Sequence, residues 1–116
     1  MNGYIIYHNP RCSKSRQTLQ LLKDAGVEPT IIEYLKTPLT KGQLRNISQF
    51  LGLRPKDFVR KTEKDFKDND LSRCLEDDEK IIEAMLSFPK IIERPIVISG
   101  GKAVVGRPPE NVQKLI

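Results

Sequence analysis

The chain has 116 residues, of which 38% are hydrophobic and 30% charged, with a formal net charge of +5. This length allows one domain with one modest core, and no apolar run approaches the roughly 20 residues of a membrane span. The N-terminus carries no secretory signal pattern, so we expect a cytoplasmic protein. The basic residues form no arginine-rich tail and no aromatic-interleaved stripe, which favours a small anion over nucleic acid as the partner.

The first third of the sequence alternates strand and helix patterns. The apolar run at residues 3–7 predicts a strand, and residues 13–25 have the pattern of a helix that Gly26 ends. The β-branched run Thr30–Tyr34 predicts a second strand. This order is that of a βαβ unit.

The middle of the chain has helical patterns. Thr40 and Gln43 have the spacing of a capping box at the start of a helix, and Gly52 ends that helix. Helices are predicted over three ranges: 40–51, 57–60 and about 76–86.

The last third returns to strand patterns. Two short β runs flank Gly100-Gly101, which predicts a hairpin, and the Pro108-Pro109-Glu110 run predicts the start of a final helix. The order βαβ, helices, ββα predicts one α/β domain with a mixed four-strand sheet. Its expected parts are a core of residues 1–36 and 89–116 and a helical insertion at about 37–88.

Cys12 lies where the first strand pattern gives way to the first helix pattern. The free N–H groups and the positive dipole end of a helix favour a thiolate there, and Arg11, Lys14 and Arg16 add positive charge. Flanking cations also make this a poor position for a core residue. The sequence therefore predicts a reactive cysteine with a lowered pKa.

Two polar residues accompany Cys12. Ser15 completes a C-x-x-S motif without a resolving cysteine, so an oxidised or adducted Cys12 needs an external thiol. Ser15 either hydrogen-bonds a bound oxyanion or is a plain first-turn polar residue. His8, the single histidine, either holds a positive charge near the thiolate, orients the loop, or is an ordinary satisfied polar residue.

The second cysteine has a different setting. Cys74 precedes the acidic run Glu76–Glu79, which disfavours a thiolate, so we expect a structural thiol rather than a resolving one. Two distant cysteines and one histidine have no metal-binding spacing, and nucleotide-binding glycine patterns are missing. We therefore expect no bound metal and no bound cofactor.

These residues carry a resemblance that spans essentially the whole chain. The order βαβ…ββα, with a cysteine at the first helix N-terminus, resembles the thioredoxin/glutaredoxin fold. The chain is similar to the glutaredoxin-dependent arsenate reductase family in three strings: His8-Asn9-Pro10-x-Cys12-x-x-Ser15-Arg16, Glu93-Arg94-Pro95 and Gly106-Arg107-Pro108. The resemblance implies reduction of arsenate to arsenite through an adduct on Cys12, with glutathione as co-substrate and glutaredoxin as the final reductant.

The resemblance also implies that Arg60, Arg94 and Arg107 surround the substrate. The planar fork of arginine meets a tetrahedral oxyanion two oxygens at a time. A cis-proline at Pro95 would face the cysteine, and Arg60 is expected to close the short helical piece at 57–60 and act from a lid. The alternative for each arginine is a solvated surface position.

Two other functions fit part of this pattern. The first is a regulator like the Spx proteins, which share the fold and bind RNA polymerase, but these typically carry C-x-x-C where this chain has Ser15. The second is a generic glutathione-dependent thiol reductase without arsenate specificity. Ser15 and the combination of His8, Arg94 and Arg107 argue against the regulator.

Overall fold

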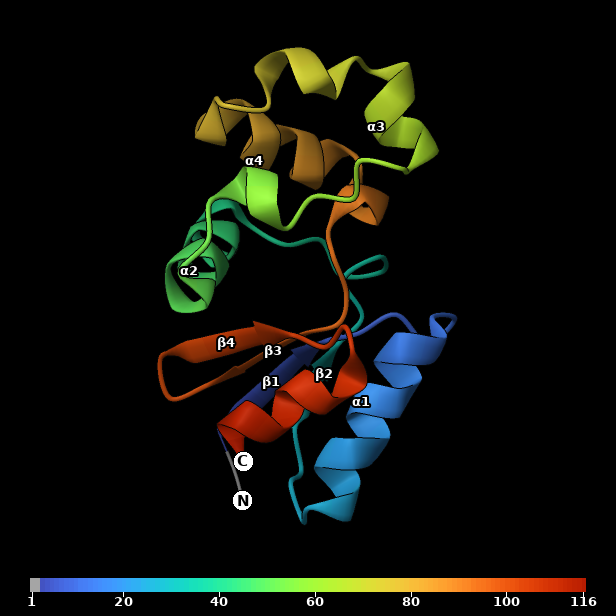
Figure 1. Cartoon of the computed structure of the whole chain (residues 1–116), viewed down its shortest axis with the longest axis vertical. Coiled ribbons are helices and arrows are strands. Elements are labelled where there is room, and N and C mark those ends of the chain that lie inside the picture. Colours follow the sequence, from blue (N-terminus) through green and yellow to red (C-terminus); the bar gives the residue numbers. More distant parts are fainter. Residues whose placement is uncertain (1–2) are drawn as a thin grey trace. The chain divides into compact units, whose positions relative to one another are not determined.

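The computed structural model describes residues 3–116 (Figure 1). The chain forms two compact units, which are described separately. Unit 1 consists of the residues up to Thr37 together with Arg94–Ile116, and unit 2 consists of Pro38–Glu93. Within residues 3–116, no helix has both the length and the apolar character that crossing a membrane requires.

Unit 1 contains a four-stranded mixed sheet with the strand order β2-β1-β3-β4. Strand β1 (Tyr4–Tyr7) pairs in parallel with β2 (Thr30–Ile32) and antiparallel with β3 (Ile96–Ser99). Strand β3 pairs antiparallel with β4 (Lys102–Val105). The predicted α/β class and mixed four-strand sheet are confirmed, although β2 is shorter than its sequence pattern.

The hairpin between β3 and β4 follows directly from its turn residues. Ser99 pairs with Lys102, so Gly100 and Gly101 alone form the connection. Their φ angles are +58° and +79°, which a two-residue turn of this type requires and which residues with a Cβ rarely adopt.

Helix α1 (Ser13–Asp24) and the terminal helix η4 (Pro109–Leu115) pack together in unit 1, and both are visible in Figure 1 beside the sheet. Alternate strand residues face these helices because side chains alternate along a strand. The core consists of Tyr4, Ile6, Leu22, Val27, Val97 and Val112. The terminal helix is a 3₁₀-helix, which has i→i+3 hydrogen bonds in place of the i→i+4 bonds of an α-helix.

Unit 2 is built from helices and short 3₁₀ segments. Its elements are α2 (Lys41–Leu51), η1 (Pro55–Asp57), α3 (Lys64–Asp68), η2 (Leu71–Cys74), α4 (Asp78–Ser87) and η3 (Pro89–Ile91). The predicted capping box is confirmed, because Gln43 N–H donates to Thr40 Oγ1 at 3.1 Å and Thr40 N–H donates to Gln43 Oε1 at 2.8 Å.

The helix predicted over 57–60 is wrong in its position. The short 3₁₀ segment η1 ends at Asp57, whose carboxylate accepts the Arg54 N–H at 3.0 Å. Val59 then pairs with Ile92 in an antiparallel β-bridge. This pairing between distant residues draws the backbone out of the helical conformation.

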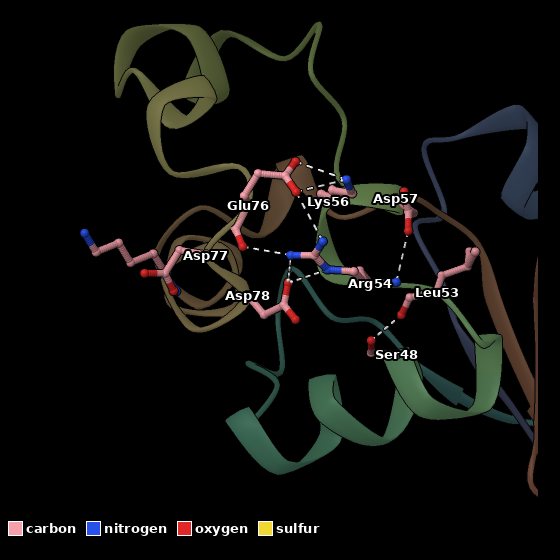
Figure 2. Close-up of polar contacts among 9 residues, drawn as sticks. Ser48, Leu53, Arg54, Lys56, Asp57, Glu76, Asp77 and Asp78 are labelled. Carbon is pink, nitrogen blue, oxygen red and sulfur yellow. Dashed lines mark hydrogen bonds and ion pairs between the residues drawn. The ribbon is translucent and has the colours of Figure 1, made fainter.

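A cluster of exposed ion pairs joins η1 to the start of α4 (Figure 2). Arg54 donates to Asp78 Oδ1 at 3.0 and 3.1 Å and to the Glu76 carbonyl at 2.7 Å. Lys56 lies 3.0 Å from Glu76, and its hydrogen bond contributes most to lowering the pKa of that carboxyl group. These side chains are solvated, so the cluster orients the segments and adds little to the free energy of unfolding.

Candidate active site

Cys12 is the N-cap residue of α1, immediately after the loop that follows β1. Its backbone is extended, with φ −94° and ψ 122°. Its N–H donates to the Asn9 carbonyl at 3.0 Å, and its carbonyl accepts the Arg16 N–H at 3.0 Å. The thiol is partly exposed, so the structure places it where the strand-to-helix pattern predicts.

The surroundings of Cys12 favour the thiolate. Burial raises the pKa of the Cys12 thiol, but several groups together outweigh it and hold the pKa below its ordinary value. These groups are the backbone N–H of Ser15, the guanidinium of Arg94 and the backbone N–H of Lys14. The N-terminal turn of α1 and one arginine therefore stabilise a negative charge on the sulfur.

The lowered pKa of Cys12 agrees with the predicted direction and with the predicted part of the helix N-terminus, but not with the predicted part of the flanking cations. The side chains of Arg11, Lys14 and Arg16 are exposed to solvent, where water screens their charge. The cation that lowers the pKa of the thiol is Arg94, which lies just before β3.

Arg107 also lies at the sulfur. Its Nη1 is 3.9 Å from Cys12 Sγ, and the residue is exposed at the end of the hairpin. Arg94 is half-buried, and its Nε is buried without a hydrogen-bond partner among the described residues. The Arg94-Pro95 and Arg107-Pro108 peptide bonds are both cis, the first as the resemblance implies.

His8 and Ser15 form a buried pair under the loop. His8 Nδ1 lies 2.6 Å from Ser15 Oγ, which also accepts the Asn9 N–H at 3.0 Å. The backbone N–H of His8 donates to the Ile32 carbonyl at 2.8 Å. These contacts tie the loop that carries Cys12 to α1 and to strand β2.

The burial of this pair decides between its predicted roles. Burial lowers the pKa of His8, with Lys23 and Arg16 acting in the same direction against Glu33, which favours the neutral imidazole. The lowered pKa disfavours a positive charge on His8, and its contacts fit an orienting role. Ser15 is fully buried and its hydroxyl is engaged in the loop, so its backbone N–H, rather than its side chain, faces the sulfur.

Arg60 belongs to unit 2 and is held there by two carboxylates. Its Nε lies 3.2 Å from Glu93, its Nη1 lies 3.3 Å from Glu63, and 18% of its side chain is exposed. Its N–H donates to the Ile91 carbonyl at 2.6 Å. Arg60 therefore follows a β-bridge and does not close a helix, which corrects the expectation of a helical lid.

Cys74 also belongs to unit 2. Its Sγ donates to the Leu71 carbonyl at 3.4 Å, at the end of η2, which fits the expected structural role. Across residues 3–116, no three His, Cys, Asp or Glu side chains gather in a way that would hold a metal ion.

Two residues near the site were given no role by the sequence patterns, although Gly106 belongs to the Gly106-Arg107-Pro108 string. Thr18 of α1 is fully buried and lies against Gly106, the residue before Arg107. The signal available in the sequence was the glycine directly before Arg107.

Comparisons with known proteins agree with this geometry. The ArsC family model matches residues 7–115. The chain is 46% identical to the uncharacterized protein YfgD of Escherichia coli K12 over 96% of the chain and 94% of that protein. It is 35% identical to an arsenate reductase of the same organism, over 100% of the chain and 82% of that protein.

A solved structure has the same fold as this chain. An arsenate reductase from Vibrio cholerae superimposes with a TM-score of 0.93 at 42% identity, over 97% of each chain. This likeness confirms the predicted thioredoxin-like α/β fold. The chain belongs to the ArsC family.

Proposed function

We propose that this protein is an arsenate reductase that reduces arsenate to arsenite through the Cys12 thiolate, with glutathione and glutaredoxin as reductants. The observation that carries the proposal is the meeting of Arg94 and Arg107 at the sulfur of a cysteine whose pKa is lowered. Relatives that are named arsenate reductases support the choice of oxyanion.

The site has the donors that a tetrahedral oxyanion needs. Arg94 has a buried Nε with no hydrogen-bond partner among the described residues, and Arg107 reaches the sulfur with one Nη. Bidentate arginine contacts orient an oxyanion, and the free N–H groups at the start of α1 add to its binding. Arsenate bound in this way presents its arsenic to Cys12.

In the first step, the Cys12 thiolate attacks arsenic(V). A sulfur–arsenic bond forms, and one arsenate oxygen leaves as hydroxide, which becomes water on taking up a proton. The arginines stabilise the negative charge that spreads over the arsenate oxygens in the transition state.

In the second step, a glutathione thiolate attacks the Cys12 sulfur. A disulfide bond forms between the two sulfurs, and the electron pair of the sulfur–arsenic bond passes to arsenic, which leaves as arsenite, arsenic(III). A glutaredoxin thiolate then attacks the glutathione sulfur of this mixed disulfide and releases the Cys12 thiolate. In sum, two thiols are oxidised to one disulfide, and arsenate is reduced by two electrons.

An external reductant follows from the C-x-x-S motif, since Ser15 supplies no second sulfur next to Cys12. The scheme requires a compartment that keeps thiols reduced, so we place the protein in the cytoplasm. Neither nucleic acid nor a membrane takes part in the scheme.

The proposal is tested by NADPH oxidation in the presence of glutathione, glutathione reductase and glutaredoxin. We expect oxidation that depends on arsenate, on glutaredoxin and on Cys12, and that sulfate does not support. Turnover with a small disulfide but none with arsenate would instead establish a generic thiol reductase. Absence of both activities, together with specific binding to RNA polymerase, would establish a regulator.

A further inference from the structure

We propose that Gly106 and Thr18 are positioning residues that set the distance between the Arg107 guanidinium and the Cys12 sulfur. The inference concerns the arrangement at Cys12 whatever its substrate, so it is tested without arsenate.

Gly106 sits in a close contact between the hairpin and α1. Its N–H donates to the Pro95 carbonyl at 2.8 Å, and its carbonyl lies 3.4 Å from Thr18 Oγ1. The Thr18 hydroxyl also lies 2.8 Å from the Lys14 carbonyl one turn earlier in α1. Thr18 and Gly106 are both buried, so other residues surround each side of the contact.

The contact leaves no room for a Cβ atom at Gly106. Such an atom would lie 2.5 Å from Thr18 Oγ1, 3.0 Å from Thr18 Cγ2 and 2.8 Å from Pro95 Cγ. The φ angle of Gly106 is outside the left-handed region, so another residue could adopt its backbone conformation. Glycine is therefore needed here for the close approach alone.

The close approach bears directly on Arg107. Thr18 lies on the helix whose N-cap is Cys12, and Arg107 follows Gly106 in the chain. Between these two segments, Arg107 Nη1 lies 3.9 Å from Cys12 Sγ. An alanine at position 106 must lengthen the 2.5 Å contact to about 3.4 Å, and we expect the resulting separation of the Arg107 segment from α1 to move Arg107 away from the sulfur.

The test compares two alkylating reagents of similar shape, iodoacetate and iodoacetamide, on Cys12 in a Cys74→Ser background. In both reactions the thiolate forms a sulfur–carbon bond and displaces iodide. Only iodoacetate carries a negative charge that Arg107 attracts. The ratio of the two rates therefore reports the cation at Cys12, whereas the iodoacetamide rate reports the thiolate population.

We expect Arg107→Gln to lower this ratio by about fivefold, because two unit charges about 4 Å apart in water interact by about 1 kcal/mol. Gly106→Ala is expected to lower the ratio less, by about 1.4-fold, because a displacement of about 0.9 Å weakens this interaction by about 0.2 kcal/mol, while the iodoacetamide rate stays within about twofold. Gly42→Ala is the matched control, because its new Cβ would lie 3.8 Å from Thr40 Oγ1, an ordinary contact.

A second variant keeps the proposal falsifiable if Gly106→Ala does not fold. In the double variant Gly106→Ala/Thr18→Ala, two of the three close contacts are absent. Its ratio of iodoacetate rate to iodoacetamide rate should therefore lie between the ratios of the two single variants. If the single variant is unfolded, the double variant must still fall below Thr18→Ala, because the Pro95 contact at 2.8 Å remains. A Gly106→Ala ratio equal to that of the parent, or a double variant equal to Thr18→Ala, overturns the proposal.

Discussion

Replacing Arg94 by lysine should lower kcat/KM for arsenate far more than the same replacement at Arg107. Both changes keep the positive charge and remove the guanidinium fork. Arg94 is half-buried, and its Nε is buried without a hydrogen-bond partner among the described residues, so a lysine cannot supply that donor. Arg107 is exposed, where water competes for its contacts.

The burial of Arg94 and the exposure of Arg107 determine how much kcat/KM each replacement should lose. Removing a preorganised donor from a partly desolvated site costs about 2–4 kcal/mol in the transition state, or about 30- to 1000-fold in kcat/KM. An exposed contact about 4 Å from the reacting sulfur contributes about 1 kcal/mol in total, and lysine keeps its charge, so Arg107→Lys should lose less than about fivefold. We therefore expect the larger loss for Arg94→Lys and the smaller for Arg107→Lys.

The assay is arsenate-dependent NADPH oxidation with glutathione and glutaredoxin in excess, and both kcat and KM for arsenate are measured. Arg45→Lys is the control, because Arg45 makes an exposed two-point ion pair with Glu79, at 2.8 and 3.0 Å, within unit 2. If Arg94→Lys matches this control in kcat and KM, Arg94 does not bind the oxyanion and the proposed site is wrong.

Three further outcomes are expected. Cys12→Ser should abolish arsenate-dependent turnover and Cys74→Ser should preserve it, and equal losses would make Cys74 a resolving cysteine. Since the native environment lowers the pKa of Cys12, the pH midpoint of its alkylation by iodoacetamide should be lower in the folded protein than in urea, and an equal or higher midpoint would contradict the site electrostatics. Thr40→Ala should lower the free energy of unfolding by about 1 kcal/mol in urea titrations through loss of the capping box, and an unchanged free energy would show that the cap adds nothing to stability.

Features that depend on neighbouring residues could be predicted from the sequence. The Gly100-Gly101 hairpin and the Thr40–Gln43 capping box need only residues a few positions apart, and both are present as expected. Cys12 at the N-terminus of α1 follows in the same way from a strand pattern that ends just before a helix pattern.

Features that depend on distant residues could not be predicted in this way. The bridge between Val59 and Ile92 prevents the helix that the local pattern around Arg60 suggested. The sequence around Cys12 indicates Arg11, Lys14 and Arg16 as the nearby charges, but the structure brings Arg94 to the sulfur from the other end of unit 1. Burial of His8, which lowers the pKa of its imidazole, likewise depends on packing and not on local sequence.

Intact-protein mass spectrometry of a mixture that lacks glutaredoxin tests the central claim most directly. The account predicts that one glutathione becomes attached to Cys12 only when arsenate and glutathione are both present, because the mixed disulfide then has no partner to reduce it. Peptide mapping should place the adduct on Cys12, and adding glutaredoxin should remove it. An unmodified Cys12, an adduct on Cys74, or an adduct that forms equally without arsenate would contradict the account.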